Sequence, residues 1–197
     1  MVDFLGREAS SIMDLDKIER AVRLVLEGIG EDPEREGLAG TPRRVARMCE
    51  EIFAGINEDP KEFLAKVYKT KHDEMVMIKN IPLYSICEHH LLPFLGKAHV
   101  AYIPRDGVIV GLSKLVRVLQ SLSRRPQVQE NLTSQFADII MEGLNPLGVL
   151  VVVEAEHLCM SMRGVSEAGT TATTSAVRGA FQSRERTRLE AMELLKR

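Results

Sequence analysis

The sequence predicts an α+β fold in which pairs of helices and pairs of strands follow one another in the order ααββααββα. Two observations support this fold class. Five segments carry apolar residues at helical spacing, and four longer runs between them, besides a short one at residues 108–110, show the alternating or continuously apolar pattern of strands. Because the strands come in adjacent pairs instead of alternating singly with helices, we expect antiparallel hairpins.

Two helices are predicted at the N-terminal end. The first covers residues 11–27 and opens with Ser11 and Asp14 at the spacing of a capping box. The second starts at Thr41, which is expected as the N-cap and is followed by a proline suited to a first helical turn. We therefore divide the chain into an N-terminal helical region, residues 1–56, and a domain of residues 57–197 that is expected to carry the functional site.

The remaining elements follow from hydrophobic periodicity. In chain order they are strands at residues 74–81, 97–103 and 108–110, helices at 113–123 and 128–144, strands at 148–156 and 170–177, and a helix at 184–196. The paired helices are expected to cover one face of the sheet. The other face and the sheet edges would then need a partner, so we expect association with further copies of the chain.

Composition excludes several classes of protein. The 197-residue chain has a net charge of −2 and no Trp, which argues against a general nucleic-acid binder. Its longest apolar run, residues 149–153, is too short to span a membrane, and its first residues are charged, unlike a secretory signal. Three cysteines cannot form a disulfide framework. These features together favour a cytoplasmic protein without membrane or nucleic-acid partners.

Cysteine and histidine gather in two short runs, which is the most informative feature of the sequence. Cys87 and His90 stand at C-x-x-H spacing, and Cys159 follows the strand predicted at residues 148–156. Two thiolates and one imidazole suit Zn²⁺, and a set of three ligands leaves a fourth position for water. An isolated C-x-x-H motif is a poor predictor of a metal site, but two such runs together favour one. We therefore predict a catalytic zinc site.

Each run also contains a histidine beyond the predicted ligands. His89 and His157 are candidates for acid–base chemistry beside an activated water. The other candidate groups have simpler interpretations. Cys49 lies on the apolar face of a predicted helix and is expected in the core, whereas His72 and His99 are expected as surface and strand residues without a catalytic role.

Positive side chains form local clusters that could gather around a polyphosphate. They are the helical pairs Arg44/Arg47 and Lys114/Arg117, together with Arg163 shortly after Cys159. Each pair could equally be a solvated helix face. The chain has no Walker A loop, so a triphosphate would be held by side chains and helix ends. The Glu130 carboxylate has the geometry to accept two hydrogen bonds from the edge of guanine.

Between residues 41 and 188, these motifs together resemble the GTP cyclohydrolase I family. The matching segments are T-P-R-R-V-A-R-M, Y-S-I-C-E-H-H, G-K-A-H-V-A-Y-I-P, G-L-S-K-L-V-R, R-R-P-Q-V-Q-E-N-L-T, H-L-C-M-S-M-R-G-V and T-T-S-A-V-R-G. The resemblance implies a zinc-dependent hydrolase that acts on purine C8 of GTP. Its products would be formate and 7,8-dihydroneopterin triphosphate, in the first step toward tetrahydrofolate or tetrahydrobiopterin.

The resemblance also implies a role for each candidate residue. Cys87, His90 and Cys159 correspond to the zinc ligands, and His89 and His157 to the acid–base histidines. Ser113 corresponds to a catalytic residue near the ribose. The substrate-binding residues would be Glu130 and Gln129 at the guanine, with Arg44, Arg47, Lys114, Arg117 and Arg163 around the triphosphate.

The family fold is the tunnelling fold, in which the sheets of several subunits close into a barrel, usually as a homodecamer with active sites shared between subunits. Two other classes remain open from the residues alone. One is a pterin synthase of the same fold, although such enzymes use a histidine-rich site. The other is a non-enzymatic nucleotide-binding or scaffold protein with structural zinc, which would need a fourth ligand.

Overall fold

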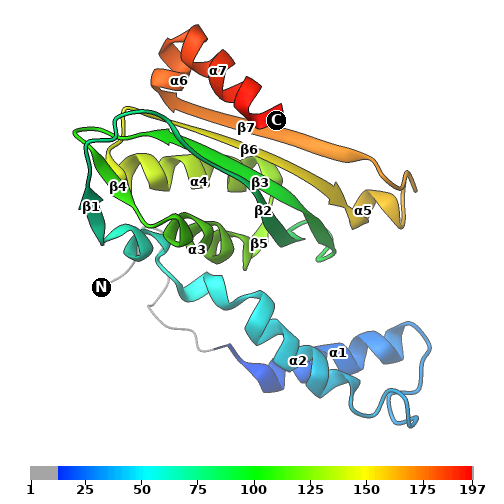
Figure 1. Cartoon of the computed structure of the whole chain (residues 1–197). Coiled ribbons are helices and arrows are strands. Elements are labelled where there is room, and N and C mark those ends of the chain that lie inside the picture. Colours follow the sequence, from blue (N-terminus) through cyan, green and yellow to red (C-terminus); the bar gives the residue numbers. More distant parts are fainter. Residues whose placement is uncertain (1–12, 197) are drawn as a thin grey trace. The chain divides into compact units, whose positions relative to one another are not determined.

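The structure is a computed structural model that describes residues 13–196 of the chain (Figure 1). Backbone contacts divide it into two compact units, Met1–Asn57 and Glu58–Arg197. Among the described residues, no helix combines the length and the hydrophobicity that crossing a bilayer requires. That the second unit carries the functional site is a prediction.

The first unit contains two α-helices, α1 (Leu15–Gly28) and α2 (Thr41–Ile52), and a short 3-10 helix, η1 (Ala54–Asn57). Asp14 is the N-cap of α1 and accepts a hydrogen bond from the Lys17 N–H at 2.8 Å. The predicted start at Ser11 lies outside the described residues. Thr41 is the first helical residue and Gly40 is the N-cap, so the predicted N-cap is one residue too late; the Thr41 hydroxyl accepts a hydrogen bond from the Arg44 guanidinium at 2.8 Å.

A five-stranded sheet forms the centre of the second unit, in the order β5-β2-β3-β6-β7. Its long strands pair antiparallel, whereas the short β5 runs parallel to the end of β2. A separate pair is formed by β1 (Val67–Lys69) and β4 (Val108–Val110). The strands of the main sheet are β2 (Val76–Cys87), β3 (Pro93–Ile103), β5 (Pro126–Gln127), β6 (Gly148–His157) and β7 (Thr171–Gly179). The predicted mixed α+β class with antiparallel hairpins is therefore confirmed.

The first hairpin is longer than the sequence predicts. The sequence pattern predicts a strand that ends at Ile81, just before Pro82, which cannot donate a hydrogen bond to a strand ladder. Instead the strand passes through a bulge, where Asn80 has φ of 57°, and continues to Cys87 with Pro82 opposite Lys97. This extension matters for the site because it carries Cys87 to the far end of the hairpin.

Two long helices, α3 (Leu112–Ser123) and α4 (Gln129–Leu144), pack against one face of the sheet. The short η2 (Pro60–Leu64) packs against both of them. The core between the helices and the sheet includes Phe94, Phe136 and Val151, all of which are fully buried. This packing gives the sheet a rigid helical support beneath the end at which β2, β3 and β6 carry the candidate site residues.

The paired helices α3 and α4 cover one face of the sheet, as predicted, but the expectation that the opposite face is left uncovered is wrong. A short turn of helix, α6 (Ala180–Ser183), leads into α7 (Glu185–Lys196). Side chains on strands alternate between faces, so Leu150 and Val152 point away from the main core. They form a second apolar cluster with Phe181 of α6 and Ala191 of α7. The C-terminal helix thus covers part of the opposite face.

Candidate metal centre and active site

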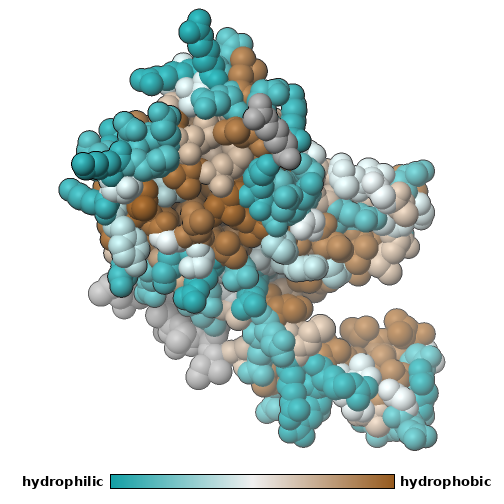
Figure 2. All heavy atoms as spheres, in the orientation of Figure 1, coloured by the Kyte–Doolittle hydropathy of each residue, from teal (hydrophilic) through white to brown (hydrophobic). Residues whose placement is uncertain are grey.

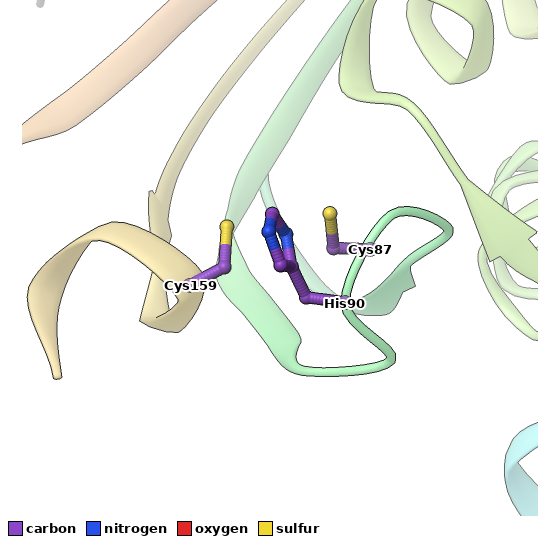
Figure 3. Close-up of side chains that lie close together, drawn as sticks. All are labelled: Cys87, His90 and Cys159. Atoms are coloured by element: carbon purple, nitrogen blue, oxygen red, sulfur yellow. The ribbon is translucent and has the colours of Figure 1, made fainter. Parts of the chain in front are cut away.

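Cys87, His90 and Cys159 lie together at one end of the sheet (Figure 3). Their ligand atoms all lie within 4.8 Å of one another. Bonds from zinc are about 2.3 Å to sulfur and about 2.0–2.1 Å to a histidine nitrogen. Small side-chain adjustments would therefore let one ion contact all three, which agrees with the predicted grouping.

A tight turn brings the first two ligands together. Cys87 is the last residue of β2, and its backbone N–H donates to the carbonyl of Leu92 at 2.9 Å, while Leu91 N–H donates back to the Cys87 carbonyl at 2.9 Å. Leu91 has φ of 52°, which is unfavourable for a residue with a β-carbon. The turn thereby places His90 beside Cys87 before the chain enters β3.

The third ligand comes from a distant part of the sequence. Strands β3 and β6 pair so that Phe94 lies opposite His157, at the end of β6. The chain then forms a short helix, α5 (Leu158–Ser161), which carries Cys159. The sequence placed Cys159 after the strand but did not reveal this helical turn, which directs the thiol toward the Cys87–His90 loop (Figure 3).

The donor set fits a metal ion with an affinity for soft ligands. Cys87 is buried, Cys159 is half-buried and His90 is exposed, so the group is reachable from one side. Burial first, and the neighbouring Cys87 second, raise the pKa of the Cys159 thiol. The Cys159 thiol thus resists ionisation in the absence of a cation, and a bound divalent ion would favour its thiolate form. Zinc is the ion that this donor set fits best.

His157 is held firmly beside the metal cluster. Its ring stacks on Phe94, with centroids 4.7 Å apart and planes 7° from parallel, and its Nε2 lies 2.7 Å from Gln129 Oε1. Burial lowers the pKa of His157, and the nearby Glu130 carboxylate offsets part of that effect. His89 differs because its side chain is exposed, with Glu88 3.9 Å away. Both histidines nevertheless lie in the segments that carry the metal ligands.

Gln129 does not have the role that the resemblance implies for its side chain. The residue is only 1% exposed, and its amide makes hydrogen bonds within the chain on both its nitrogen and its oxygen. A side chain with these partners faces the protein interior and not the substrate. Direct guanine binding by the Gln129 side chain is therefore not supported.

Glu130 is the next residue and faces outward. It lies in the first turn of α4 and is exposed beside a cleft of about 480 Å³ between α4 and β7. Clefts of this size are typical of small-molecule sites. The cleft is lined by Glu130, Thr133, Ser134, Thr174, Arg178 and Gln182, among others. A polar cleft with one free carboxylate is suited to a ligand that offers hydrogen-bond donors.

The C-terminal end of α3 lies beside the turn that carries Cys87 and His90. The Ser85 hydroxyl donates to the carbonyl of Ser123, the last residue of α3, at 2.8 Å. The chain then enters β5, where Gln127 pairs with Cys87. The orientation of α3 is therefore fixed, with its other end pointing away from the metal cluster.

The predicted ribose and phosphate residues of α3 lie toward that other end. The helix rises about 1.5 Å per residue, so Ser113 lies about 15 Å from Ser123 along its axis. Lys114 is in the same turn and Arg117 is one turn nearer to the metal end. The start of α3 follows β4, whose Val110 N–H donates to the Tyr102 hydroxyl at 3.5 Å, near the opposite end of β3. One chain does not bring Ser113 and Lys114 to its own metal cluster.

The remaining predicted cations fall into two places. Arg163 lies in the exposed loop after α5 and donates to the Cys159 carbonyl at 3.4 Å, so it belongs to the metal end of the second unit. Arg44 and Arg47 are exposed on α2 of the first unit. Cys49, on the same helix, was predicted to lie in the core, but it is only half-buried. His99 is a strand residue as expected, but it is buried.

A Cys–His–Cys group that could hold a metal ion, an ordered histidine and a polar cleft are features of a metal-dependent enzyme, here on a mixed α+β fold. Residues 18–196 match the family model of GTP cyclohydrolase I. The chain belongs to the GTP cyclohydrolase I family.

Two relatives of more than 60% identity agree with this assignment. The chain is 64% identical to GTP cyclohydrolase 1 of Pelotomaculum thermopropionicum, over 94% of this chain and 98% of the relative. It is 63% identical to GTP cyclohydrolase 1 of Carboxydothermus hydrogenoformans, over 93% and 96%. Among solved structures, an archaeosine synthase QueF-Like in the apo form overlaps 55% of this chain and 97% of its own, with 20% identity and a TM-score of 0.42. The relatives favour the cyclohydrolase over the pterin synthase and scaffold alternatives.

Proposed function

We propose that this chain is a zinc-dependent GTP cyclohydrolase I that releases formate from C8 of GTP and forms 7,8-dihydroneopterin triphosphate. The observation that carries the proposal is the Cys87–His90–Cys159 cluster beside His157, in a chain of this family. We assign the chemistry to the second unit, Glu58–Arg197, because all of these residues lie in it. The product would feed a pterin or folate pathway.

Each group has a distinct task in this proposal. Zinc, held by Cys87, His90 and Cys159, would supply Lewis acidity and activate water near neutral pH. The reaction also needs two proton donors. The first acts at N7 of the purine as C8 is attacked. The second acts near the ribose oxygen, because the ribose opens and rearranges before the new ring closes. His157 and His89 are the two groups available for these transfers. Glu130 would read the guanine edge.

Recognition of the base by Glu130 leads to a prediction about substrate choice. The Glu130 carboxylate would accept hydrogen bonds from N1–H and the 2-amino group of guanine. Adenine has neither donor, and would place a lone pair opposite the carboxylate. ATP should therefore release at least about 100-fold less formate than GTP under the same conditions. The Glu130→Ala variant should show a raised KM for GTP.

The control for this experiment is Glu142→Ala, which removes a carboxylate from the far end of the same helix. It should leave formate release from GTP unchanged. Equal formate release from ATP and GTP by the wild-type protein would show that Glu130 reads something other than guanine.

We further propose that the chain adopts the tunnelling fold, with its strands closing into a barrel across subunits of a homodecamer. Two observations support association. The main sheet ends in β7, whose nine residues form an edge strand, and such edges favour pairing with another chain. In the first unit, Leu24 and Val25 of α1 and its C-cap residue Ile29 are 61–69% exposed, and Figure 2 shows apolar surface on this unit.

A shared active site also accounts for the position of Lys114. This residue lies at the end of α3 remote from its own metal cluster. In an oligomer, the start of α3 in one subunit would complete the phosphate site beside the metal cluster of a neighbour.

Mixing two inactive variants tests this arrangement. Cys87→Ser removes a metal ligand and Lys114→Ala removes a phosphate-binding residue from the other end of α3. After joint dissociation and reassembly, sites that combine the intact metal cluster of one subunit with the intact Lys114 of another should form, and GTP turnover should return. A mixture that stays inactive, or a fully active monomer by sedimentation, would contradict shared sites. Each variant reassembled alone serves as the control.

A further inference from the structure

Gln129 is a buried glutamine at the start of α4 whose amide orientation is fixed by its partners. Its Nε2 donates to the backbone carbonyls of Val153 at 3.1 Å and Ala172 at 3.0 Å. Carbonyl oxygens only accept hydrogen bonds, so the NH₂ group must face β6 and β7. The amide oxygen therefore points the opposite way, toward His157.

That orientation determines which nitrogen of His157 carries a proton. Gln129 Oε1 lies 2.7 Å from His157 Nε2. Because an amide oxygen only accepts, Nε2 must donate, and the neutral imidazole then has its lone pair on Nδ1. Within residues 13–196, no side chain or backbone group makes a hydrogen bond to Nδ1. Stacking on Phe94 keeps the ring plane fixed while Nδ1 stays free.

We propose that Gln129 is a positioning residue that holds the proton of His157 on Nε2, so that Nδ1 is the atom that exchanges protons with the substrate. This inference rests on the proposed function only for the identity of the substrate. The hydrogen bond to Gln129 stays in place during the exchange, because Nε2 keeps its proton whether Nδ1 is protonated or not. His157 can therefore deliver and recover a proton without turning its ring.

Gln129 is itself held by the edge of the sheet. Its Nε2 also lies 3.1 Å from Thr174 Oγ1. The Thr133 hydroxyl donates to the backbone carbonyl of Gln129 at 2.7 Å and lies 2.7 Å from Thr174 Oγ1. If the amide rotated, the backbone carbonyls of Val153 and Ala172 would lose this donor. A buried amide in such a network has one favourable orientation, which suits a residue that fixes a tautomer.

The test compares Gln129→Met with Gln127→Met in zinc-loaded protein. Gln127 is also buried, and its Nε2 donates to the Leu122 carbonyl and to Gln135 Oε1, but it has no contact with a histidine. Both variants thus lose a buried amide of similar size, and only one loses the acceptor for His157. Zinc content, measured for each variant, verifies that the fold around the cluster is intact.

The direct readout is the ¹⁵N NMR spectrum of ring-labelled histidine at about pH 8.5, two units above the usual histidine pKa of about 6.5. The His157 signals are assigned by their loss in His157→Gln. Wild type and Gln127→Met should show a protonated Nε2 with a slowly exchanging N–H proton, and Gln129→Met should lose that slow exchange. A wild-type His157 protonated on Nδ1, or slow exchange that persists in Gln129→Met, would overturn the proposal. If Gln129→Met does not fold, the wild-type spectrum is sufficient to decide, because it shows which nitrogen of His157 carries the proton.

Kinetics provide the second readout. Gln129→Met should lower kcat for GTP about 10- to 100-fold with little change in KM, as expected for a residue that acts through another side chain. Gln127→Met should keep the wild-type kcat. An equal loss in both variants would indicate a purely structural role. If zinc-loaded wild type does not turn over GTP, the proposed function fails, whereas the NMR outcome still decides the role of Gln129.

Discussion

Replacing Cys159 with serine should abolish zinc binding and GTP turnover together. Cys159 is one of three ligand groups within 4.8 Å of one another, so its loss leaves only Cys87 and His90. Two ligands cannot hold zinc as three can, and a serine hydroxyl is a poor replacement for a thiolate. Elemental analysis should show one zinc per subunit in the wild type and almost none in the variant, with formate release at background.

The control for this substitution is Cys49→Ser. Cys49 lies half-buried on α2, in the first unit, and is not in the ligand group. This variant should keep both its zinc and its turnover of GTP. A Cys159→Ser protein that retains a full complement of zinc would refute the assignment of the ligands.

His157→Ala should have the opposite pattern, with zinc retained and turnover lost. His157 lies beside the metal cluster but is not one of its ligands. Removing a positioned proton donor typically costs about 10²- to 10⁴-fold in rate. We therefore expect a fall of that size in kcat with unchanged zinc content. His89→Ala should likewise keep its zinc and lose turnover, because His89 is proposed as the second donor.

A matched control is His72→Ala, since His72 is exposed and its side chain makes no hydrogen bond within the described part of the chain. It should behave as the wild type in both measurements. Wild-type turnover in His157→Ala would remove that residue from the reaction. Loss of zinc in the same variant would instead make it a ligand and would contradict the three-residue cluster.

Hydrophobic periodicity was sufficient to predict the long elements, because each buries one apolar face. Helices α3 and α4 and strand β6 differ from the predicted ranges by at most one residue. The elements that were missed are those without such a face. They include the three-residue β1, the two-residue β5 and the single turn α5, whose positions depend on tertiary contacts. The C-terminal helix was predicted, but no local pattern indicates which face of the sheet it covers.

The site shows the same division between local and long-range information. The type and spacing of Cys87, His90 and Cys159 were enough to predict a ligand group, and the structure places them together. The position of Gln129 could not be predicted in this way. Its burial depends on β6 and β7, which lie far along the chain, and a polar residue beside Glu130 is more simply interpreted as facing the substrate.

The central claim is that the zinc-loaded chain opens the base of GTP, and one assay tests it directly. The full-length protein is incubated with GTP, and formate and the pterin product, made fluorescent by oxidation, are measured together. We predict that both appear in equal amounts, that a chelator stops their formation, and that added zinc restores it. Release of phosphate from GTP without formate, by protein with one zinc per subunit, would contradict the account.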